Sequence, residues 1–387
     1  MSRADTPVIM LSAGEASGDL HGATLCRALR ELAPGARLVG MGGARMAEAG
    51  MEVVADPTGH AVVGMSEAVG RIPGLYRAYR ALVRRIYEER PRALVLIDFP
   101  EFNLRLARQA RRAGVPVVYF IPPQLWAWRR GRIRQMARRV TRVLAVFPFE
   151  QALYEEAHVG VDFVGHPLLD VLPLHLTRDD ARRRLGLDPA ASVVGLLPGS
   201  RREEVARLLP PMLEAARRLA AVDPRRRFLI GAAPTVDRAQ VTALLAAAAE
   251  ADGPRVEIVE GLTHELMAGS DVVLIASGTA TLEAALLGAP MVVCYRVSRL
   301  TETVARMLAR VSWISLPNIV AGRKAVPEVL QDEVTGHRLA SEALHLLEDA
   351  AAATAQRAAF KEIRGRLGEP GVGPRAARAV LQAARVA

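Results

Sequence analysis

The stretch SVVGLLPGSRREEVARLLPPMLEAARRLAA, residues 192–221, carries the pattern that determines the fold class. Its first part, 192–197, is a mostly apolar run without alternation, which is typical of a strand covered on both faces. A turn of Pro198, Gly199 and Ser200 follows, and a helical pattern then runs over 202–221. A strand that leads at once into a helix predicts a βα unit of a parallel sheet.

The same alternation of apolar runs and helical patterns repeats on both sides of this unit, so the sequence predicts doubly wound α/β sheets. Further helices are predicted at 22–32, 104–113 and 279–287. The predicted strands, in chain order, are 8–12, 37–40, 93–97, 115–121, 143–147, 161–164, 192–197, 227–231, 256–259, 272–276 and 290–295.

The alternation pauses near 165–190, where Pro, His and charged residues replace the apolar runs. We therefore expect two domains, 1–168 and 169–359, which the length of 387 residues accommodates. Two similar α/β halves facing a cleft is the predicted architecture. Ligands of such sheets bind beyond the carboxyl ends of the strands, so the loops there are the candidate sites.

Composition narrows the function classes. The net charge of +10 favours an anionic partner: nucleic acid, an anionic membrane surface or a phosphorylated substrate. Two cysteines, Cys26 and Cys294, fit buried thiols in a reducing compartment. The short apolar stretch at the N-terminus predicts a first strand and not a signal peptide. No window approaches 18 uninterrupted apolar residues, so we expect no membrane span. No His, Cys and carboxylate cluster has metal-ligand spacing, and no metal or cofactor is predicted.

Two polar loops follow predicted strands in the first half. Glycines in the loop 12–23 permit close backbone approach, and its Glu15 and Asp19 suit sugar hydroxyls better than a pyrophosphate, which they would repel. Asp98 follows the strand 93–97, where partial desolvation raises a carboxyl pKa toward a value useful for a general base. Asn103 follows closely in the sequence and is within reach of the same carboxyl end of the strand. Helix capping is the alternative role for these carboxylates.

A basic segment lies in 120–143, where Trp126 and Trp128 precede seven arginines. Nucleic-acid binding needs basic and aromatic residues spread over a surface, whereas these are confined to one strand-to-helix junction. They favour the phosphate of a small or lipid substrate, with Trp126 and Arg129 as candidate acceptor contacts. A solvated helix face is the alternative for the outer arginines.

Two loops of the second half suit phosphate. Ser200 and Arg201 stand at the start of a predicted helix, where free amides and the helix dipole favour an anion and the guanidinium adds a charge-assisted contact. The second loop presents small residues at another helix start, and a carboxylate one turn along can accept ribose hydroxyls. These residues are Ser277, Gly278, Thr279 and Glu283. Ordinary helix caps and a surface Glu are the alternative.

Two further features have open interpretations. Asn318 either hydrogen-bonds a ligand or caps the next helix. The segment 74–90 places apolar residues on one helical face and arginines around much of the rest. Such a helix either lies in a bilayer interface with its cations on anionic headgroups or packs on its own sheet.

Together and in order, these loops resemble the lipid-A-disaccharide synthase family. The resemblance covers almost the whole chain, and the combination of WAW, PGSR, SGTATLE and LPNxxAGR is specific, although no single motif is. The matching segments are SAGEASGD (12–19), GMGGARM (40–46), DFPEFN (98–103), WAWRRGR (126–132), FPFE (147–150), FVGHPL (163–168), LLPGSRREEV (196–205), SGTATLEAAL (277–286), YRVS (295–298) and LPNIVAGR (316–323).

The resemblance implies a GT-B fold with the donor nucleotide in the second half and a final helix, about 360–387, that crosses back onto the first. It implies transfer of 2,3-diacylglucosamine from UDP to 2,3-diacylglucosamine 1-phosphate, which yields a β-1,6-linked disaccharide and UDP. The enzyme would be cytoplasmic and peripheral to the inner membrane of a Gram-negative-type bacterium. Its partners would be both lipid substrates and the anionic membrane surface, without nucleic acid, and a homodimer is left open.

The implied reaction inverts an α-linked donor to a β-linked product by one in-line displacement. Asp98 would take the proton from the acceptor 6-hydroxyl, and Glu15 is open as a base that shares this role. The donor side would consist of Arg201 and the amides of Ser200, Gly278 and Thr279 on the leaving UDP in place of a metal, with Ser277 beside them, Glu283 on the ribose and Asn318 on the donor.

Two alternatives belong to different function classes. Another GT-B enzyme, such as a UDP-GlcNAc 2-epimerase, would need a second acid/base pair and no acceptor. A basic protein that binds membrane or nucleic acid without catalysis would show affinity that falls steeply with salt and no release of UDP. The two nucleotide loops weigh against this second alternative.

Overall fold

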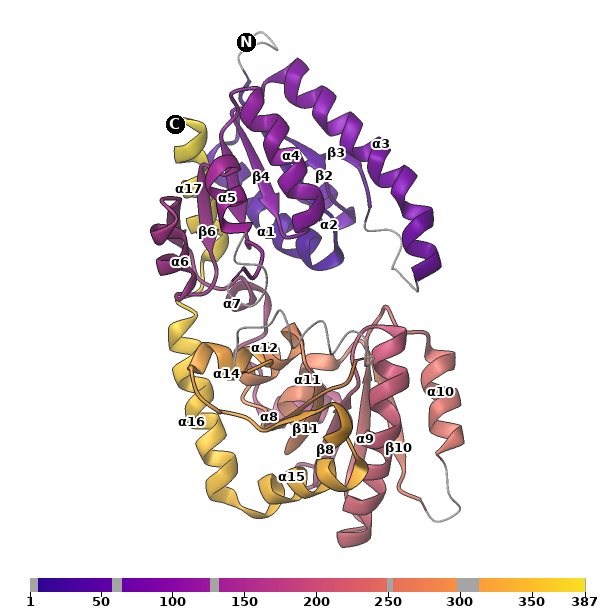
Figure 1. The fold of residues 1–387 in the computed structure, drawn as a ribbon. Coiled ribbons are helices and arrows are strands. Elements are labelled where there is room, and N and C mark those ends of the chain that lie inside the picture. The colour runs from indigo at the N-terminus through magenta and orange to yellow at the C-terminus, as the bar shows by residue number, and fades with distance from the viewer. Residues whose placement is uncertain (1–5, 58–64, 126–131, 249–252, 298–312, 387) are drawn as a thin grey trace. The chain divides into compact units, whose positions relative to one another are not determined.

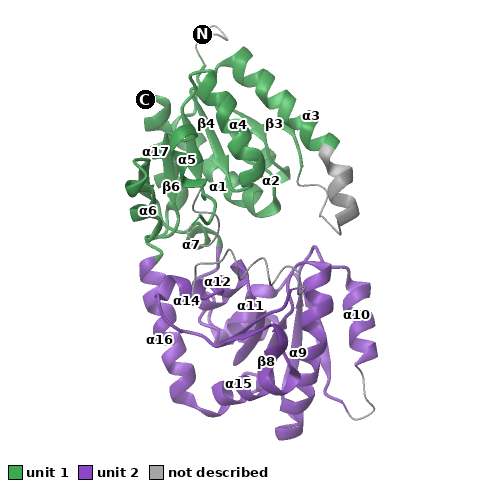
Figure 2. Ribbon diagram, viewed as in Figure 1, with its two compact units in different colours: residues 1–171, 367–387 green, residues 172–366 purple. Residues whose placement is uncertain are grey.

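The computed structural model describes residues 6–57, 65–125, 132–248, 253–297 and 313–386, apart from the side chains of 65–72. Its chain divides into two compact units, residues 1–171 with 367–387 and residues 172–366, which Figure 2 colours separately. Each unit is a parallel β-sheet with helices packed on it (Figure 1). The predicted fold class of two Rossmann-like α/β halves is confirmed.

Unit 1 contains a seven-stranded parallel sheet in the order β3-β2-β1-β4-β5-β6-β7. Its strands are β1 (Val8–Ala13), β2 (Arg37–Met41), β3 (Glu52–Ala55), β4 (Ala93–Ile97), β5 (Val117–Phe120), β6 (Arg142–Ala145) and β7 (Gly160–Phe163). Its helices are α1 (Ala16–Leu32), α2 (Ala44–Glu48), α3 (Met65–Glu89), α4 (Pro100–Arg112), α5 (Ile133–Arg139), α6 (Glu150–Glu156), α7 (Leu168–Val171) and α17 (Val372–Ala384).

Unit 2 contains a six-stranded parallel sheet in the order β10-β9-β8-β11-β12-β13. Its strands are β8 (Val193–Leu197), β9 (Arg227–Ala232), β10 (Val256–Glu260), β11 (Val272–Ala276), β12 (Met291–Tyr295) and β13 (Glu328–Leu330). Its helices are α8 (Arg178–Arg184), α9 (Arg202–Val222), α10 (Arg238–Ala247), α11 (Thr263–Gly269), α12 (Thr279–Leu286), α14 (Leu316–Ala321), α15 (Gly336–Glu348) and α16 (Ala350–Arg366), and η2 (Gln331–Glu333) is a 3₁₀ turn.

The strand order reverses at the same point in both sheets. In unit 1, β1 lies between β2 and β4, and Ala13 is in register with Ile97. In unit 2, β8 lies between β9 and β11, and Leu197 is in register with Ile275. The loops after β1, β4, β8 and β11 leave the carboxyl edges of the sheets at the points where the strand order reverses. Ligands of doubly wound sheets bind at such points.

Two helices begin earlier than the sequence pattern indicated. Helix α1 starts at Ala16, behind an extended Glu15, so that Asp19 lies in its first turn and not in a loop. Helix α4 starts at Pro100, whose fixed φ and missing N–H suit a first helical position. The residues of these first turns are mostly small or polar, so the pattern of apolar residues did not indicate them.

The last helix, α17, packs on α1 in unit 1, as the resemblance implied, whereas α16 belongs to unit 2. The Asp170 carboxylate caps α17 by accepting from the amides of Gly371 at 2.6 Å and Gly373 at 2.9 Å. Arg375 Nε donates to Val164 O at 2.9 Å. A Cβ at Gly373 would lie 2.9 Å from Thr24 Cγ2, so glycine permits the close helix packing.

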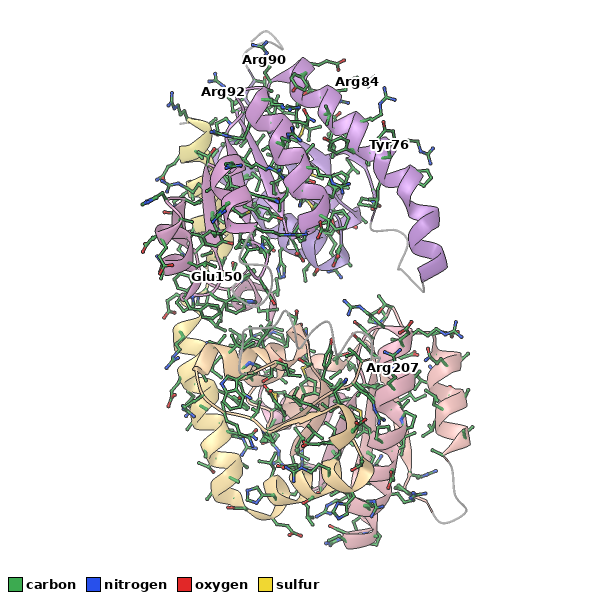
Figure 3. The ribbon with its side chains drawn as sticks, viewed as in Figure 1. Tyr76, Arg84, Arg90, Arg92, Glu150 and Arg207 are labelled. Carbon is green, nitrogen blue, oxygen red and sulfur yellow. The ribbon has the colours of Figure 1, made fainter. Side chains whose placement is uncertain are left out.

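Helix α3 has an inner face that belongs to the core of unit 1. Ala78, Leu82 and Ile86 are buried in the apolar cluster with β2 and β4, so packing on the sheet accounts for this part of the apolar stripe. Tyr76 remains 59% exposed and projects from the helix in Figure 3. No helix in the described part of the chain is long and apolar enough to span a bilayer.

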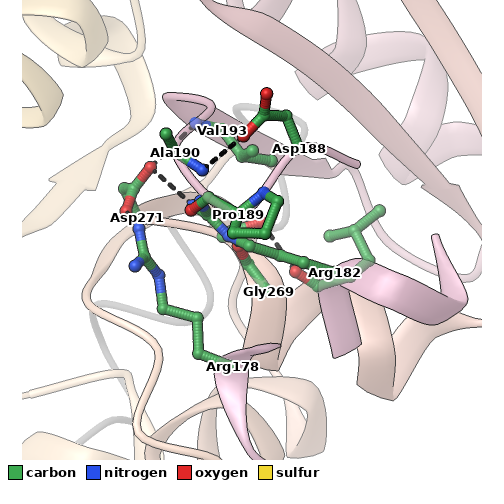
Figure 4. A network of polar contacts seen from close by, with 10 residues as sticks. Arg178, Arg182, Asp188, Pro189, Ala190, Val193, Gly269 and Asp271 are labelled. Atoms are coloured by element: carbon green, nitrogen blue, oxygen red, sulfur yellow. Dashed lines mark hydrogen bonds and ion pairs between the residues drawn. The ribbon is translucent and has the colours of Figure 1, made fainter. Parts of the chain in front are cut away.

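A buried guanidinium ties α8 to the sheet of unit 2 (Figure 4). The Arg182 side chain is fully buried and donates to Gly269 O at 2.9 Å, Pro189 O at 2.5 Å and Asp271 Oδ2 at 3.0 Å. Asp271 also pairs with Arg178 and accepts from the amide of Val193 at 2.8 Å. The network joins the segment before β8 to the start of β11.

Arg182→Ala should destabilise unit 2 by about 3–5 kcal/mol, because it leaves buried carbonyls and a carboxylate without their partner. Arg183→Ala is the matched control, since that side chain is 72% exposed and pairs with the exposed side chain of Asp180, so its loss should leave stability almost unchanged. Urea denaturation of both variants measures the difference. Equal midpoints would show that the network adds nothing to stability.

Candidate functional site

The turn after β4 is strained. Asp98 and Phe99 both have φ of 48°, a left-handed conformation that non-glycine residues rarely adopt. Each such residue costs on the order of 1–3 kcal/mol and persists only where the surroundings hold it. Pro100 then opens α4. Strain of this kind at the carboxyl end of a central strand marks a candidate site.

Three buried side chains hold this turn. Asn103 Nδ2 donates to Asp98 O at 2.7 Å and to Ile97 O at 3.2 Å, and Tyr119 Oη donates to Asp98 O at 2.8 Å. Asn103 Oδ1 accepts from Ser12 Oγ at 2.7 Å, which joins the ends of β1 and β4. Asn103 is fully buried and its amide bonds to groups of the protein, so it positions the turn.

The Asp98 carboxyl has the electrostatics of a general base. Burial and the nearby Glu15 carboxylate raise its pKa to about 6, and the hydrogen bond from the Phe99 amide partly opposes this rise. Glu15 itself is exposed at the start of α1. The two loops touch at Gly14, where a Cβ would lie 2.2 Å from the Phe99 ring, so only glycine fits there. The structure thus brings Glu15 and Asp98 together.

Asp19 is placed differently from the expectation of a sugar contact. Only 5% of the surface of Asp19 is exposed. Its carboxylate accepts from the amides of Gly43 at 2.7 Å, Arg45 at 3.1 Å and Met46 at 3.1 Å, which are the free donors at the start of α2. Asp19 therefore caps α2 and fixes the GMGGARM segment against α1.

The loop after β8 presents its amides at the start of α9. Gly199 has a φ of 113°, and Arg201 is the N-cap of the helix with a side chain that is 78% exposed. The Glu204 carboxylate accepts from the amides of Ser200 at 3.2 Å and Arg201 at 3.3 Å, and Arg201 Nη1 donates to it at 3.0 Å. The Glu204 carboxylate thus caps these amides as the N3 residue of a capping box.

The loop after β11 forms the neighbouring helix start. Gly278 and Thr279 are exposed at the start of α12, and Ser277 Oγ donates to Ile314 O at 3.1 Å. Glu283 lies one turn along the helix and faces His264 of α11, with Nε2 and Oε2 3.4 Å apart. The hydrogen bond to Glu283 raises the pKa of His264.

Asn318 is fully buried and its amide serves the fold of the segment before β13. Its Oδ1 accepts from the amides of Ala325 at 2.6 Å and Val326 at 2.9 Å, and its Nδ2 donates to Glu328 at 2.8 Å. Glu328 in turn accepts from Ser315 Oγ at 2.6 Å and the Ser315 amide at 2.9 Å. Asn318 thus lies within α14 and holds the backbone at Ala325 and Val326, a role that neither interpretation, ligand contact or cap of the next helix, described.

Sequence reasoning missed several residues of these sites. Tyr119 is the penultimate residue of β5 and carries the only polar side-chain atom of this apolar strand, which is the one local signal of its role. His264 and Glu204 gave no signal, because their partners lie on other elements or one turn away. Trp126 and Arg129 lie outside the described residues. No group of three His, Cys, Asp or Glu in the described ranges is placed to hold a metal ion.

Comparison with solved structures finds the same fold in two enzymes at low identity. A UDP-GlcNAc 2-epimerase from Neisseria meningitidis bound to UDP-GlcNAc has a TM-score of 0.58 and 14% identity, covering 97% of this chain and 99% of that one. MurG from Acinetobacter baumannii has a TM-score of 0.58 and 15% identity over 97% and 99% of the two chains. At these identities the likeness concerns the fold alone.

Sequence comparison finds much closer relatives. The lipid-A-disaccharide synthase of Anaeromyxobacter dehalogenans strain 2CP-C is 46% identical over 376 residues, which is 97% of each chain. The model of the lipid-A-disaccharide synthetase family matches residues 9–374, a range that contains every loop described above. The chain therefore belongs to the lipid-A-disaccharide synthetase family.

Proposed function

We propose that this protein transfers 2,3-diacylglucosamine from UDP to the 6-hydroxyl of 2,3-diacylglucosamine 1-phosphate. The products are a β-1,6-linked disaccharide 1-phosphate and UDP. Family membership supports the reaction, and the observation that carries the mechanism is the half-buried Asp98 with Glu15 beside it at the switch point of unit 1. A carboxylate with a raised pKa is suited to general-base work near neutral pH.

The chemistry is one displacement. Asp98 accepts the proton of the acceptor 6-hydroxyl as that oxygen attacks C1 of the donor sugar, and the bond from C1 to the UDP oxygen breaks on the opposite face. An α-linked donor thereby gives a β-linked product. Burial and the Glu15 carboxylate keep the Asp98 pKa high, and Asn103 and Tyr119 hold the turn in place. Trp126 and Arg129 are retained as proposed acceptor contacts.

The donor side of the proposal uses the two helix starts of unit 2. Arg201 and the amides of Ser200, Gly278 and Thr279 stabilise the charge that builds on the departing diphosphate, without a metal. The diphosphate displaces the Glu204 carboxylate from its amides. Glu283, oriented by His264, accepts ribose hydroxyls, and Ser277 supports the loop. Asp19 and Asn318 act by holding backbone in place.

Release of UDP tests the function directly. Purified protein is given UDP-2,3-diacylglucosamine with and without 2,3-diacylglucosamine 1-phosphate, and UDP and disaccharide are measured. We expect both products in equal amounts and only with the acceptor present. Conversion of the donor sugar without acceptor would instead favour an epimerase of the same fold, and no reaction with either set would refute the proposal.

The reaction should depend on pH through Asp98. Because the base acts only when deprotonated and its pKa is about 6, kcat/KM should fall about tenfold per pH unit below pH 6 and level off above it. Glu15→Gln removes a neighbouring negative charge and should move this limb to lower pH. If the acid limb of the kcat/KM profile does not move in the Glu15→Gln variant, then Glu15 does not influence the pKa of Asp98.

The proposal extends to the location of the protein. Both lipid substrates reside in a membrane, and the excess of positive charge favours an anionic surface, so we place the enzyme at the cytoplasmic face of the inner membrane as a peripheral protein. The exposed Tyr76 and the arginines of α3 support this placement. A homodimer remains compatible with it.

A further inference from the structure

A groove lies on unit 1 where α3, α4 and the end of α5 meet. It has a volume of about 640 Å³, within the range of small-ligand sites. Its wall begins at Phe99, the residue directly after Asp98, so the groove starts beside the proposed base. Nothing in the proposed reaction chemistry accounts for it.

The wall of the groove is aromatic and aliphatic. Phe99 stacks on Phe102 with ring centroids 5.5 Å apart, and Tyr79 meets Phe102 edge-on at 5.9 Å. Leu75 and Tyr76 extend this wall along α3. A continuous hydrocarbon surface open to solvent is suited to an apolar chain, because covering it removes apolar area from water.

The other side of the groove is cationic. Arg105, Arg108 and Arg139 line it, and within the described residues none of the three forms an ion pair with an acid. Arg139 donates to Leu104 O at 3.0 Å, a neutral acceptor, and burial together with the charge of Arg108 lowers its pKa. Glu101 also borders the groove but pairs with Arg132 at 2.5 Å. The three guanidinium groups therefore favour an anion.

We propose that this groove holds one acyl chain of the acceptor, with the acceptor phosphate on Arg105 and Arg108. The inference rests on the proposed function and adds the site of its lipid. Three arguments favour the acceptor as the ligand of this groove. The groove starts at the residue after Asp98, the proposed base that acts on the acceptor. It combines an apolar wall with cations, and the proposed function assigns the donor diphosphate to the loops of unit 2.

Arg105→Ala with Arg108→Ala tests the cationic side. Both side chains are exposed on α4, so the helix should fold normally. We expect the KM for the acceptor to rise on the order of 10- to 100-fold through lost charge-assisted contacts, with kcat and the donor KM within about twofold. The matched control is Arg111→Ala with Arg112→Ala, two exposed arginines of the same helix outside the groove, which should leave all three constants unchanged.

Leu75→Ser with Tyr76→Ser tests the apolar side. The acceptor is varied in the length of its acyl chains and is used below the concentration at which it forms micelles. The wild-type KM for the acceptor should then fall by about threefold to fourfold per added CH₂ that the groove buries. The variant should flatten this dependence while the dependence on donor chain length stays as in the wild type. Circular dichroism checks folding in every variant, and UDP affinity checks that the loops of unit 2 are unaffected.

The outcomes separate the possible failures. A wild type without acceptor-dependent UDP release refutes the proposed function, whatever the groove does. An active wild type whose acceptor KM is no more sensitive to the groove variants than to the control overturns the groove assignment. A flattened dependence on donor chain length also overturns it and would make the groove a donor site. A loss confined to binding of phosphatidylglycerol vesicles, with the acceptor KM intact, overturns it as well and would make the groove a membrane contact.

Discussion

Asp98→Asn should lower kcat by about 10²- to 10⁴-fold, because the amide cannot accept the proton of the attacking hydroxyl. The amide is nearly the same size as the carboxyl, and the backbone carbonyl of Asp98 keeps its bonds from Asn103 and Tyr119, so the strained turn should persist. The measurement is UDP release at saturating substrates. UDP affinity should be unchanged, since the loops proposed to bind the nucleotide lie on unit 2.

Glu101→Gln is the matched control for this variant. Glu101 lies three residues further along the chain, and its carboxylate is 67% exposed and paired with Arg132. We expect its kcat to stay within about threefold of the wild type, because an exposed surface pair contributes little. If Asp98→Asn loses no more activity than Glu101→Gln, then Asp98 is not the base, and Glu15 becomes the residue to replace next.

Arg201→Ala should weaken UDP binding by about 10- to 100-fold, the loss expected for a hydrogen bond to a charged partner. The exposed guanidinium sits at the N-cap of α9, where Glu204 now occupies the amides. Since the same contact stabilises the leaving group, kcat should also fall. Calorimetric titration with UDP and a donor saturation curve measure the two effects.

Arg202→Ala is the control at the next position, an exposed arginine already inside the helix. It removes the same charge at the adjacent position of the chain. Equal weakening in the two variants would mean that the general positive field, and not a contact from Arg201, attracts the diphosphate.

Much of the fold could be read from the sequence because its central strands are covered on both faces. Every residue of β4, β8 and β11 is buried, and such strands give unbroken apolar runs. The strands that the sequence analysis missed are β3 and β13, which are short, lie at sheet edges and begin with Glu52 and Glu328. An edge strand needs apolar residues on less of its surface, so its pattern is weak.

The candidate site was predictable in the residues that follow central strands. Glu15, Asp98, Ser200 and Thr279 could be proposed from the sequence because parallel strands deliver their next residues to one edge of the sheet. The roles of other residues were not predictable. Asp19 proved to be a cap for α2, because its partners lie about 25 residues away in sequence and only the packing of α2 on α1 brings them together.

By itself the sequence determined two doubly wound sheets, the loops at their switch points, and the family, since all three depend on local patterns of apolar residues, glycines and charges. Tertiary structure alone decided which polar side chains remain available for substrate. Asn103 and Asn318 are consumed by backbone groups of distant segments, whereas Asp98 keeps a carboxyl whose pKa burial has raised. The physical reason is that hydrogen-bond partners and desolvation are properties of packing between segments, which no local pattern encodes.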